Sequence, residues 1–324
     1  MRLSRWCVGL PMLLGAVLLM ACSKESSEES AIPEGNALPL VVDVEGQKQE
    51  VLDWRAERVA RLQRPDGWLS LVALQWLEYG NSFVGSGATK GVRLPVGPEE
   101  IGLITLERND TVRFKATPGS GVLLDGKPAS GTVVLRSDMD EGGPTVVSFN
   151  KGDASFVLIK RADRIGLRVR DALAPTRTGF AGIDYFDIDT SYRFNARFEA
   201  HPAGQKLGIV NVMGMEEPMD NPGVVVFERD GVEYRLEAVD EGDGRLFLIF
   251  ADRTSGHETY AAARFLYAEP ADVEGTTVVD FNRAYNPPCA FTGFSTCPLP
   301  PVSNRLDLRI EAGEKKPRKP GKSA

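Results

Sequence analysis

The segment GVVVFERDGVEYRLEAVDE, from Gly223 to Glu241, carries the clearest folding signal in this chain. Two runs rich in β-branched and aromatic residues flank the pair Asp230-Gly231. Asp-Gly is a favoured turn for a two-residue hairpin, because both residues tolerate the positive φ that such turns require. The segment therefore predicts an antiparallel β-hairpin.

Apolar runs of similar length continue on both sides of this hairpin. They include YRFNARFEA and KLGIVNV before it, and RLFLIFAD and TTVVDFNRAY after it. An aromatic-rich connector precedes these runs, so we predict that residues 173–315 form one β-rich region.

Residues 80–171 also consist of short apolar runs separated by turn residues. Short apolar runs such as IGLITLE, TVRFKA and SFVLIKR are separated by Gly, Pro, Asn and Asp at intervals of roughly 8–12 residues, which is typical of an antiparallel sandwich or barrel. Their order resembles forkhead-associated sandwiches, although the Arg and Ser that bind phosphothreonine there have no clear counterpart here.

The segment EVLDWRAERVARLQR, residues 50–64, predicts an amphipathic helix. Its apolar residues recur at helical spacing, and Pro65-Asp66-Gly67 ends the pattern. The following WLSLVALQWL suits either a short helix or a buried strand. We therefore predict a mainly β fold: an N-terminal helix and a β-sandwich over residues 49–172, then a second antiparallel sandwich- or barrel-like region.

The first 22 residues have the pattern of a targeting segment. Arg2 and Arg5 precede an apolar stretch, which ends in Leu19-Met20-Ala21-Cys22. This ending resembles a bacterial lipobox, which implies cleavage before Cys22 and acylation of its thiol; the alternative is a plain signal peptide cleaved near Ala21. Residues 23–48, rich in Ser and Glu at their start, are predicted to be a flexible tether. Ser23 resembles the outer-membrane default, so we expect a lipid-anchored protein of the bacterial cell envelope, facing the periplasm.

Composition limits the classes of partner. The chain of 324 residues has 42% hydrophobic residues and a formal net charge of −7. This composition supports a packed core and argues against a nucleic-acid binder, which needs a basic face. The basic end, residues 316–324, is predicted to be a disordered tail. No nucleotide-binding, zinc-protease or EF-hand motif is present, so no cofactor is expected.

Four phrases are similar to the DUF1684 family of bacterial proteins. They are GWLSLVALQWLEYGNSFVGS, IKRADRIGLRVRD, FLIFADRTSGHETYAAARFLYAE and DFNRAYNPPCAFTGFSTCPLPPVSNRLDLRIEAGEK. They follow the same order and span about residues 50–315. The family is a domain of unknown function, so the resemblance implies a shared fold and no particular reaction.

The last phrase contains Cys289 and Cys297. In an oxidising envelope such a pair usually forms a disulfide, and the neighbouring prolines would stiffen the loop ends. A metal site is not expected, because the chain has only two histidines to complete one. A reactive thiol is the remaining alternative.

The same phrase supplies most of the candidate site residues. Polar side chains on both sides of its loop are predicted to line a pocket: Asp280, Asn282, Tyr285, Asn286, Asn304 and Glu311. The competing interpretation is that these residues bond local backbone. Arg264 is a candidate anion ligand or else a structural arginine. His257, Asp280 and Glu311 are weak catalytic candidates, although His257 also suits a hairpin tip.

Three functions follow from these observations. The first is a binding or accessory module for a small ligand or an envelope component. The second is a cofactor-independent, hydrolase-like enzyme that uses the groups around Asp280. The third is a structural or assembly lipoprotein with the membrane as its partner.

Overall fold

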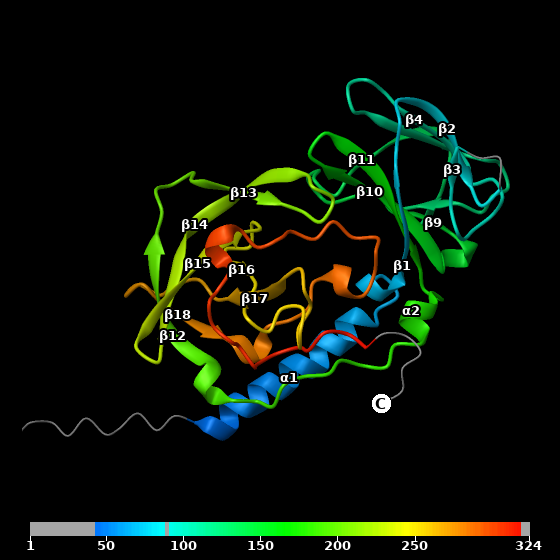
Figure 1. The fold of residues 1–324 in the computed structure, drawn as a ribbon. Coiled ribbons are helices and arrows are strands. Elements are labelled where there is room, and N and C mark those ends of the chain that lie inside the picture. Colours follow the sequence, from blue (N-terminus) through cyan, green and yellow to red (C-terminus); the bar gives the residue numbers. More distant parts are fainter. Residues whose placement is uncertain (1–42, 88–90, 319–324) are drawn as a thin grey trace, which may run out of the picture. The chain divides into compact units, whose positions relative to one another are not determined.

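A computed structural model describes residues 43–87 and 91–318. The predicted signal segment, Cys22, most of the predicted tether and most of the basic tail lie outside these residues. Within them, the chain is mainly β, with one long helix near its start (Figure 1). The predicted fold class is confirmed. None of the described helices has the length and apolarity that crossing a bilayer requires.

Helix α1 spans Val44–Leu62 and begins within the segment that was expected to be a tether. Its start is set by Asp43, whose carboxylate accepts a hydrogen bond from the backbone N–H of Gly46 at 2.8 Å. An aspartate at this position satisfies a donor that the first helical turn leaves free. Apolar periodicity alone missed this extra turn, because Val44 is the only large apolar residue in it.

The first β region contains two sheets. One has the strand order β1-β11-β10-β9-β6-β7 and the other the order β3-β2-β4-β5-β8. Phe114 and Ile104 from the second sheet share one buried core with Phe156 and Leu167 from the first, so the two sheets pack as a sandwich. The strands are β1 (Leu71–Trp76), β2 (Gly80–Gly85), β3 (Val92–Arg93), β4 (Gly102–Leu106), β5 (Val112–Ala116), β6 (Leu123–Leu124), β7 (Lys127–Pro128), β8 (Thr132–Leu135), β9 (Val147–Phe149), β10 (Ala154–Arg161) and β11 (Arg164–Asp171).

The ambiguous segment after α1 is divided between two structures. Trp68–Ser70 form a single 3-10 turn, and Leu71–Trp76 form strand β1. Strand β1 pairs with β11 at the edge of the sandwich. A second 3-10 turn, Asn150–Gly152, connects β9 to β10.

The second β region is built on one seven-stranded sheet with the order β17-β16-β15-β14-β12-β18, and β13 pairs with β14. The terminal strands β17 and β18 contact each other, so this sheet curls around its core. Phe227, Phe250 and Phe281 lie at the centre of that core. The strands are β12 (Arg193–Ala200), β13 (Lys206–Val210), β14 (Glu216–Arg229), β15 (Val232–Asp240), β16 (Leu246–Phe250), β17 (Arg264–Ala268) and β18 (Thr276–Asp280).

The predicted hairpin is formed by β14 and β15. Arg229 pairs with Val232 across the turn, and both Asp230 and Gly231 have a positive φ, of 54° and 76°. These are the two turn positions that the Asp-Gly pair was expected to occupy. The hairpin prediction is confirmed.

Short helical turns and an extended C-terminal segment complete the second region. Helix α1, shown in blue in Figure 1, contacts this region through Glu50, which bonds Arg193 and Arg283 at 3.1 and 3.0 Å. The backbone of Lys315 bonds Asp184 on the connector that follows the sandwich. The remaining helical elements are α2 (Pro175–Thr178) and the 3-10 turns Thr190–Tyr192, Phe281–Arg283, Pro288–Ala290 and Val302–Asn304.

The loop after β18 connects the two β regions. The backbone N–H of Val212, beyond β13, donates to the carbonyl of Cys297 in this loop. The loop also contacts the sandwich, where the Thr296 hydroxyl accepts hydrogen bonds from Arg161 and Arg168. One segment thus touches strands from both regions, and it carries the most unusual sequence in the chain.

Candidate pocket between the two β regions

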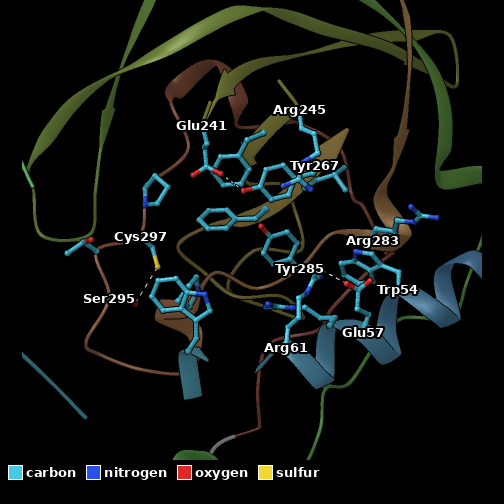
Figure 2. A pocket seen from close by; sticks show the side chains of 18 of the residues that line it. Trp54, Glu57, Arg61, Glu241, Arg245, Tyr267, Arg283, Tyr285, Ser295 and Cys297 are labelled. Carbon is cyan, nitrogen blue, oxygen red and sulfur yellow. Dashed lines mark hydrogen bonds and ion pairs between the residues drawn. The ribbon is translucent and has the colours of Figure 1, made fainter. Parts of the chain in front are cut away.

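A pocket of about 620 Å³ lies where α1, the sandwich, the curled sheet and the loop after β18 meet. Figure 2 shows Tyr267 and Tyr285 in the middle of this pocket, with Cys297 on one side and Trp54 on the other. This volume is in the usual range for small-molecule sites, roughly 300–1,000 Å³. The lining includes aromatic, charged and small polar side chains: Trp54, Arg58, Trp68, Arg161, Arg168, Glu241, Arg245, Phe247, Tyr267, Arg283, Tyr285, Thr296 and Cys297.

Aromatic rings form one wall of the pocket. Phe247 on β16 pairs in register with Tyr267 on β17, and their rings stack with centroids 4.7 Å apart. The Tyr267 ring is stacked in turn on Tyr285, at 6.3 Å and 14°. Because side chains on a strand alternate between faces, Phe265 and Tyr267 point to the same side of β17 and extend the wall.

The two tyrosines of this wall are neutral. Burial raises the pKa of both phenols well above the ordinary value. The hydroxyl of Tyr267 donates to the carboxylate of Glu241. The wall therefore offers flat apolar surface with a few polar groups at its edge, which is the usual composition of a ligand site.

Arginines give the pocket its charge. Six arginines line it against three glutamates, so its lining is cationic although the whole chain is acidic. Arg58 lies 4.7 Å from the Tyr285 ring centroid, and Arg245 lies 4.2 Å from that of Tyr267. Cations over aromatic faces are stabilised by the ring quadrupole, so the arginines and rings support each other's positions.

Arg168 on β11 has the most unusual environment of the six. It is 5% exposed, and its only side-chain hydrogen bond within the described residues is a long one, of 3.5 Å, to Thr296. Its Nε has no partner. The indole of Trp68 covers the guanidinium at 5.4 Å. Burial lowers the pKa of Arg168 to about 10, so the group remains charged near neutral pH.

The two cysteines of the loop lie beside this arginine. Both are free in this structure, so the predicted disulfide is not present in it. The backbone N–H of Cys289 donates to the sulfur of Cys297 at 3.1 Å, and the Cys289 sulfur contacts Ser295 Oγ at 2.9 Å. A hydrogen bond from Cys297, with help from Ser295 and Arg168, lowers the pKa of the Cys289 thiol. Cys297 itself lines the pocket.

Among the predicted pocket residues, only Tyr285 lines this pocket. Asp280 caps the 3-10 turn that follows β18, where it accepts a hydrogen bond from the backbone N–H of Asn282 at 3.0 Å. Asn282 exchanges hydrogen bonds with the backbone of Asp189. These two residues are therefore local structural groups, as the competing interpretation of an Asp-x-Asn turn expected.

The other two asparagines also bond backbone. Asn304 joins β15 to β16 through hydrogen bonds with Glu237 and with the carbonyl of Ile249. Asn286 donates to Glu314 and to the carbonyl of Lys315, which attaches the C-terminal segment. Both are buried and do not face the pocket.

The remaining candidates do not line the pocket. Arg264 is 1% exposed and binds Asp252 and the carbonyls of Ile310 and Ala312, which makes it a structural arginine. His257 and Glu311 are exposed and do not line the pocket. Asp280, the third weak catalytic candidate, is also absent from the pocket lining, and its carboxylate caps its own turn.

The arginines on β10 and β11 were missed by sequence reasoning. A signal was present in RIGLRVRD, where Arg164, Arg168 and Arg170 share one face of a strand whose other face is apolar. Such alternation is ordinary for a solvated strand face, so it pointed to no site. Arg168 is buried between Trp68 and the loop from the second region, whose Thr296 contacts it.

No group of three or more His, Cys, Asp or Glu side chains within residues 43–87 and 91–318 is arranged to hold a metal ion. The polar groups of the pocket are mainly donors: guanidiniums, phenols and a threonine hydroxyl. This set suits an organic anion better than a cation.

Comparisons with known proteins place the chain in a family without assigning an activity. No curated protein matches the sequence. An uncharacterized protein of Haloarcula marismortui, solved by solution NMR, is 31% identical over a match that covers 43% of this chain and 78% of that one, with a TM-score of 0.36. Residues 178–315 match DUF1684, described as a protein of unknown function, and the chain belongs to this family.

Proposed function

We propose that the protein is a binding module that holds a small organic ligand in the pocket between its two β regions. The observation that carries this proposal is the pocket itself, in which α1, both β regions and the loop after β18 converge on about 620 Å³. A structural lipoprotein has no need of such a space. The hydrolase-like alternative has less support, because the predicted acid and base groups, His257, Asp280 and Glu311, do not line this pocket.

The pocket wall suggests the body of the ligand. Phe247, Tyr267 and Tyr285 form a continuous stack, and Trp54 lies 6.3 Å from Tyr285 between ring centroids. Rings in this arrangement favour a planar or apolar ligand body. The arginines around them favour negative charge on that ligand.

Ligand binding is measurable through the tryptophans of the pocket. We expect Trp54 and Trp68 to change their fluorescence when small aromatic acids and phosphate esters are titrated into the full chain. Tyr267→Leu removes one ring of the stack and should weaken binding roughly tenfold or more, as loss of a buried aromatic contact does. Tyr79→Leu changes an exposed tyrosine outside the pocket and serves as the matched control. A library without any binder, or equal binding by Tyr267→Leu, would contradict the proposal.

We further propose that this module is held at the membrane by acylation of Cys22 and faces the periplasm. The lipobox-like LMAC sequence supports the anchor, and the same compartment would favour a Cys289–Cys297 disulfide. Mass spectrometry of the mature protein, with and without reductant, tests both points. A mature N-terminus without acyl mass excludes the anchor, and free thiols under envelope conditions exclude the disulfide.

A further inference from the structure

We propose that the pocket contains an oxyanion subsite at Arg168, which binds a phosphate or carboxylate group of the ligand. The inference rests on the proposed function, because it names the part of the ligand that this arginine would hold.

Three arginines of the described residues are buried, and Arg168 is the exception among them. Arg58, 7% exposed, bonds Glu314 at 2.9 Å, and Arg264, 1% exposed, bonds Asp252 at 3.4 Å. Arg168, 5% exposed, has no carboxylate within 4.0 Å among the described residues. A buried charge without a counter-charge is costly, so proteins normally pair such groups. The partner that Arg168 lacks is an anion, and Arg168 lines the pocket in which a ligand would supply it.

The neighbouring charged residues do not neutralise the positive charge of Arg168. Asp138, an acid that acts electrostatically on Arg168, forms a salt bridge of 2.8 Å with Arg161, the other sandwich arginine in the pocket. Asp138 is thus paired with Arg161, and Arg168 is left as an unpaired positive charge at this end of the pocket. Planar guanidiniums bind carboxylate and phosphate oxygens through paired N–H donors.

Thr296 adds a further donor to the subsite. Its Oγ1 accepts hydrogen bonds from Arg161 at 3.1 Å and from Arg168 at 3.5 Å. A hydroxyl that accepts from two cations is left to donate its own proton to an anion. Trp68 covers one face of the Arg168 guanidinium and restricts its orientation. Two guanidiniums and a hydroxyl thus converge in a partly desolvated place, where charge-assisted hydrogen bonds are strong.

The thiols are the rival source of negative charge. Cys297 lines the pocket next to Thr296, and the pKa of the Cys289 thiol is lowered. A thiolate there would partly neutralise Arg168 and compete with an external anion. The experiment therefore includes a variant in which both cysteines are serine.

The test compares three probes of similar body and different charge. Phenyl phosphate, benzoate and neutral benzyl alcohol are titrated into the full chain at matched ionic strength, with binding followed by calorimetry. We expect one or both anions to bind roughly 10- to 100-fold more tightly than benzyl alcohol, the gain typical of charge-assisted hydrogen bonds. A stronger response to phenyl phosphate identifies a phosphate ester as the natural ligand type, and a stronger response to benzoate identifies a carboxylate.

The variants show whether Arg168 is responsible. Arg168→Gln should abolish the preference for anions, and Arg113→Gln, which alters an exposed arginine of the same sandwich, should keep it. Arg168→Lys retains the charge without the paired donors and should keep only part of the preference, which provides a second readout if Arg168→Gln does not fold. The Cys289→Ser/Cys297→Ser variant should bind the anions at least as well as the native chain.

Several outcomes would overturn the subsite. One is an equal affinity for all three probes in the native chain. Another is an anion preference that survives in Arg168→Gln. A third is an anion preference that arises only when both cysteines are serine, which would make a thiolate the native counter-charge. If benzyl alcohol still binds in these cases, the pocket function stands and the subsite alone fails; if no probe binds, the proposed function fails as well.

Discussion

The guanidinium of Arg58 lies 2.9 Å from the carboxylate of Glu314, which is 256 residues further along the chain. Both side chains are buried, and the second carboxylate oxygen accepts the backbone N–H of Asn286 at 2.8 Å. This contact joins the first helix to the C-terminal segment. It also positions Arg58, which lines the pocket, against the face of the Tyr285 ring.

Breaking this pair should therefore destabilise the fold. Arg58→Met leaves Glu314 buried without its counter-charge, so we expect the free energy of unfolding to fall by about 3–5 kcal/mol. Urea denaturation followed by circular dichroism measures the change. The double variant Arg58→Met/Glu314→Leu should lose less than the sum of the single variants. Lys48→Met, which breaks an exposed pair with Glu45, should cost no more than about 1 kcal/mol and is the control.

We expect a smaller loss of stability when the N-terminal cap of α1 is removed. Asp43→Ala removes the carboxylate that accepts from Gly46, and we expect a loss of about 1 kcal/mol in unfolding free energy. Asp43→Asn keeps a capping oxygen and should be close to neutral. Hydrogen exchange should show faster opening of the first helical turn in the alanine variant. Unchanged exchange would mean that the helix does not begin at Val44.

A variant of Asn304 can distinguish a structural role from a role in ligand binding. Its side chain makes three hydrogen bonds to the backbones of β15 and β16. Asn304→Ala should cost about 2–4 kcal/mol, because buried backbone groups lose their partners. The folded variant should still bind pocket ligands with native affinity. Val302→Ala, a change at an exposed neighbour, should alter stability by less than about 0.5 kcal/mol. If Asn304→Ala lost ligand binding but kept its stability, Asn304 would be a ligand-binding residue and not a structural one.

We expect the alkylation of the Cys289 thiol to have a distinctive pH dependence. Its pKa is lowered in the folded protein, mainly by the hydrogen bond from Cys297. Alkylation by iodoacetamide should therefore persist at a lower pH in the folded chain than in the urea-unfolded chain. Cys297→Ala removes the donor and should move the profile of Cys289 back toward ordinary thiols.

The same shift has a consequence for stability. The folded state binds the Cys289 proton more weakly than the unfolded state does, so stability rises with pH through the interval between the two pKa values. The contribution is complete above the ordinary thiol pKa and is lost as the pH falls through the lowered one. A Cys289→Ser variant should lack this part of the pH profile. A profile identical to that of the native chain would contradict the assignment.

Local patterns were enough to predict most of the β-structure. The Asp230-Gly231 turn fixed the register of β14 and β15, because a two-residue hairpin admits few alternatives. The apolar runs between residues 80 and 171 also corresponded to strands, because side chains on a strand alternate between a buried and an exposed face. The start of α1 was less predictable, since its first turn is polar and depends on one capping side chain.

The candidate site was predicted less well. Asp280, Asn282, Asn286 and Asn304 were noticed as polar residues in an unusual segment, and the structure uses them to bond backbone in that segment. Tyr285 was the one predicted pocket residue that lines the pocket, and Cys297, predicted as a disulfide partner, lines it too. Polar side chains near turns have local backbone partners within reach, so their chemistry alone cannot distinguish a cap from a ligand.

Residue order along the chain thus specifies the periodicities of strand and helix, the turns and the total charge, because these depend on neighbours a few positions apart. The pairing of Arg58 with Glu314 and the isolation of Arg168 depend on which distant segments meet. Arg168 is an ordinary strand residue until the loop carrying Thr296 and Cys297 covers it. Burial of its charge, and with it the anion-binding character of the pocket, arises only in the folded chain.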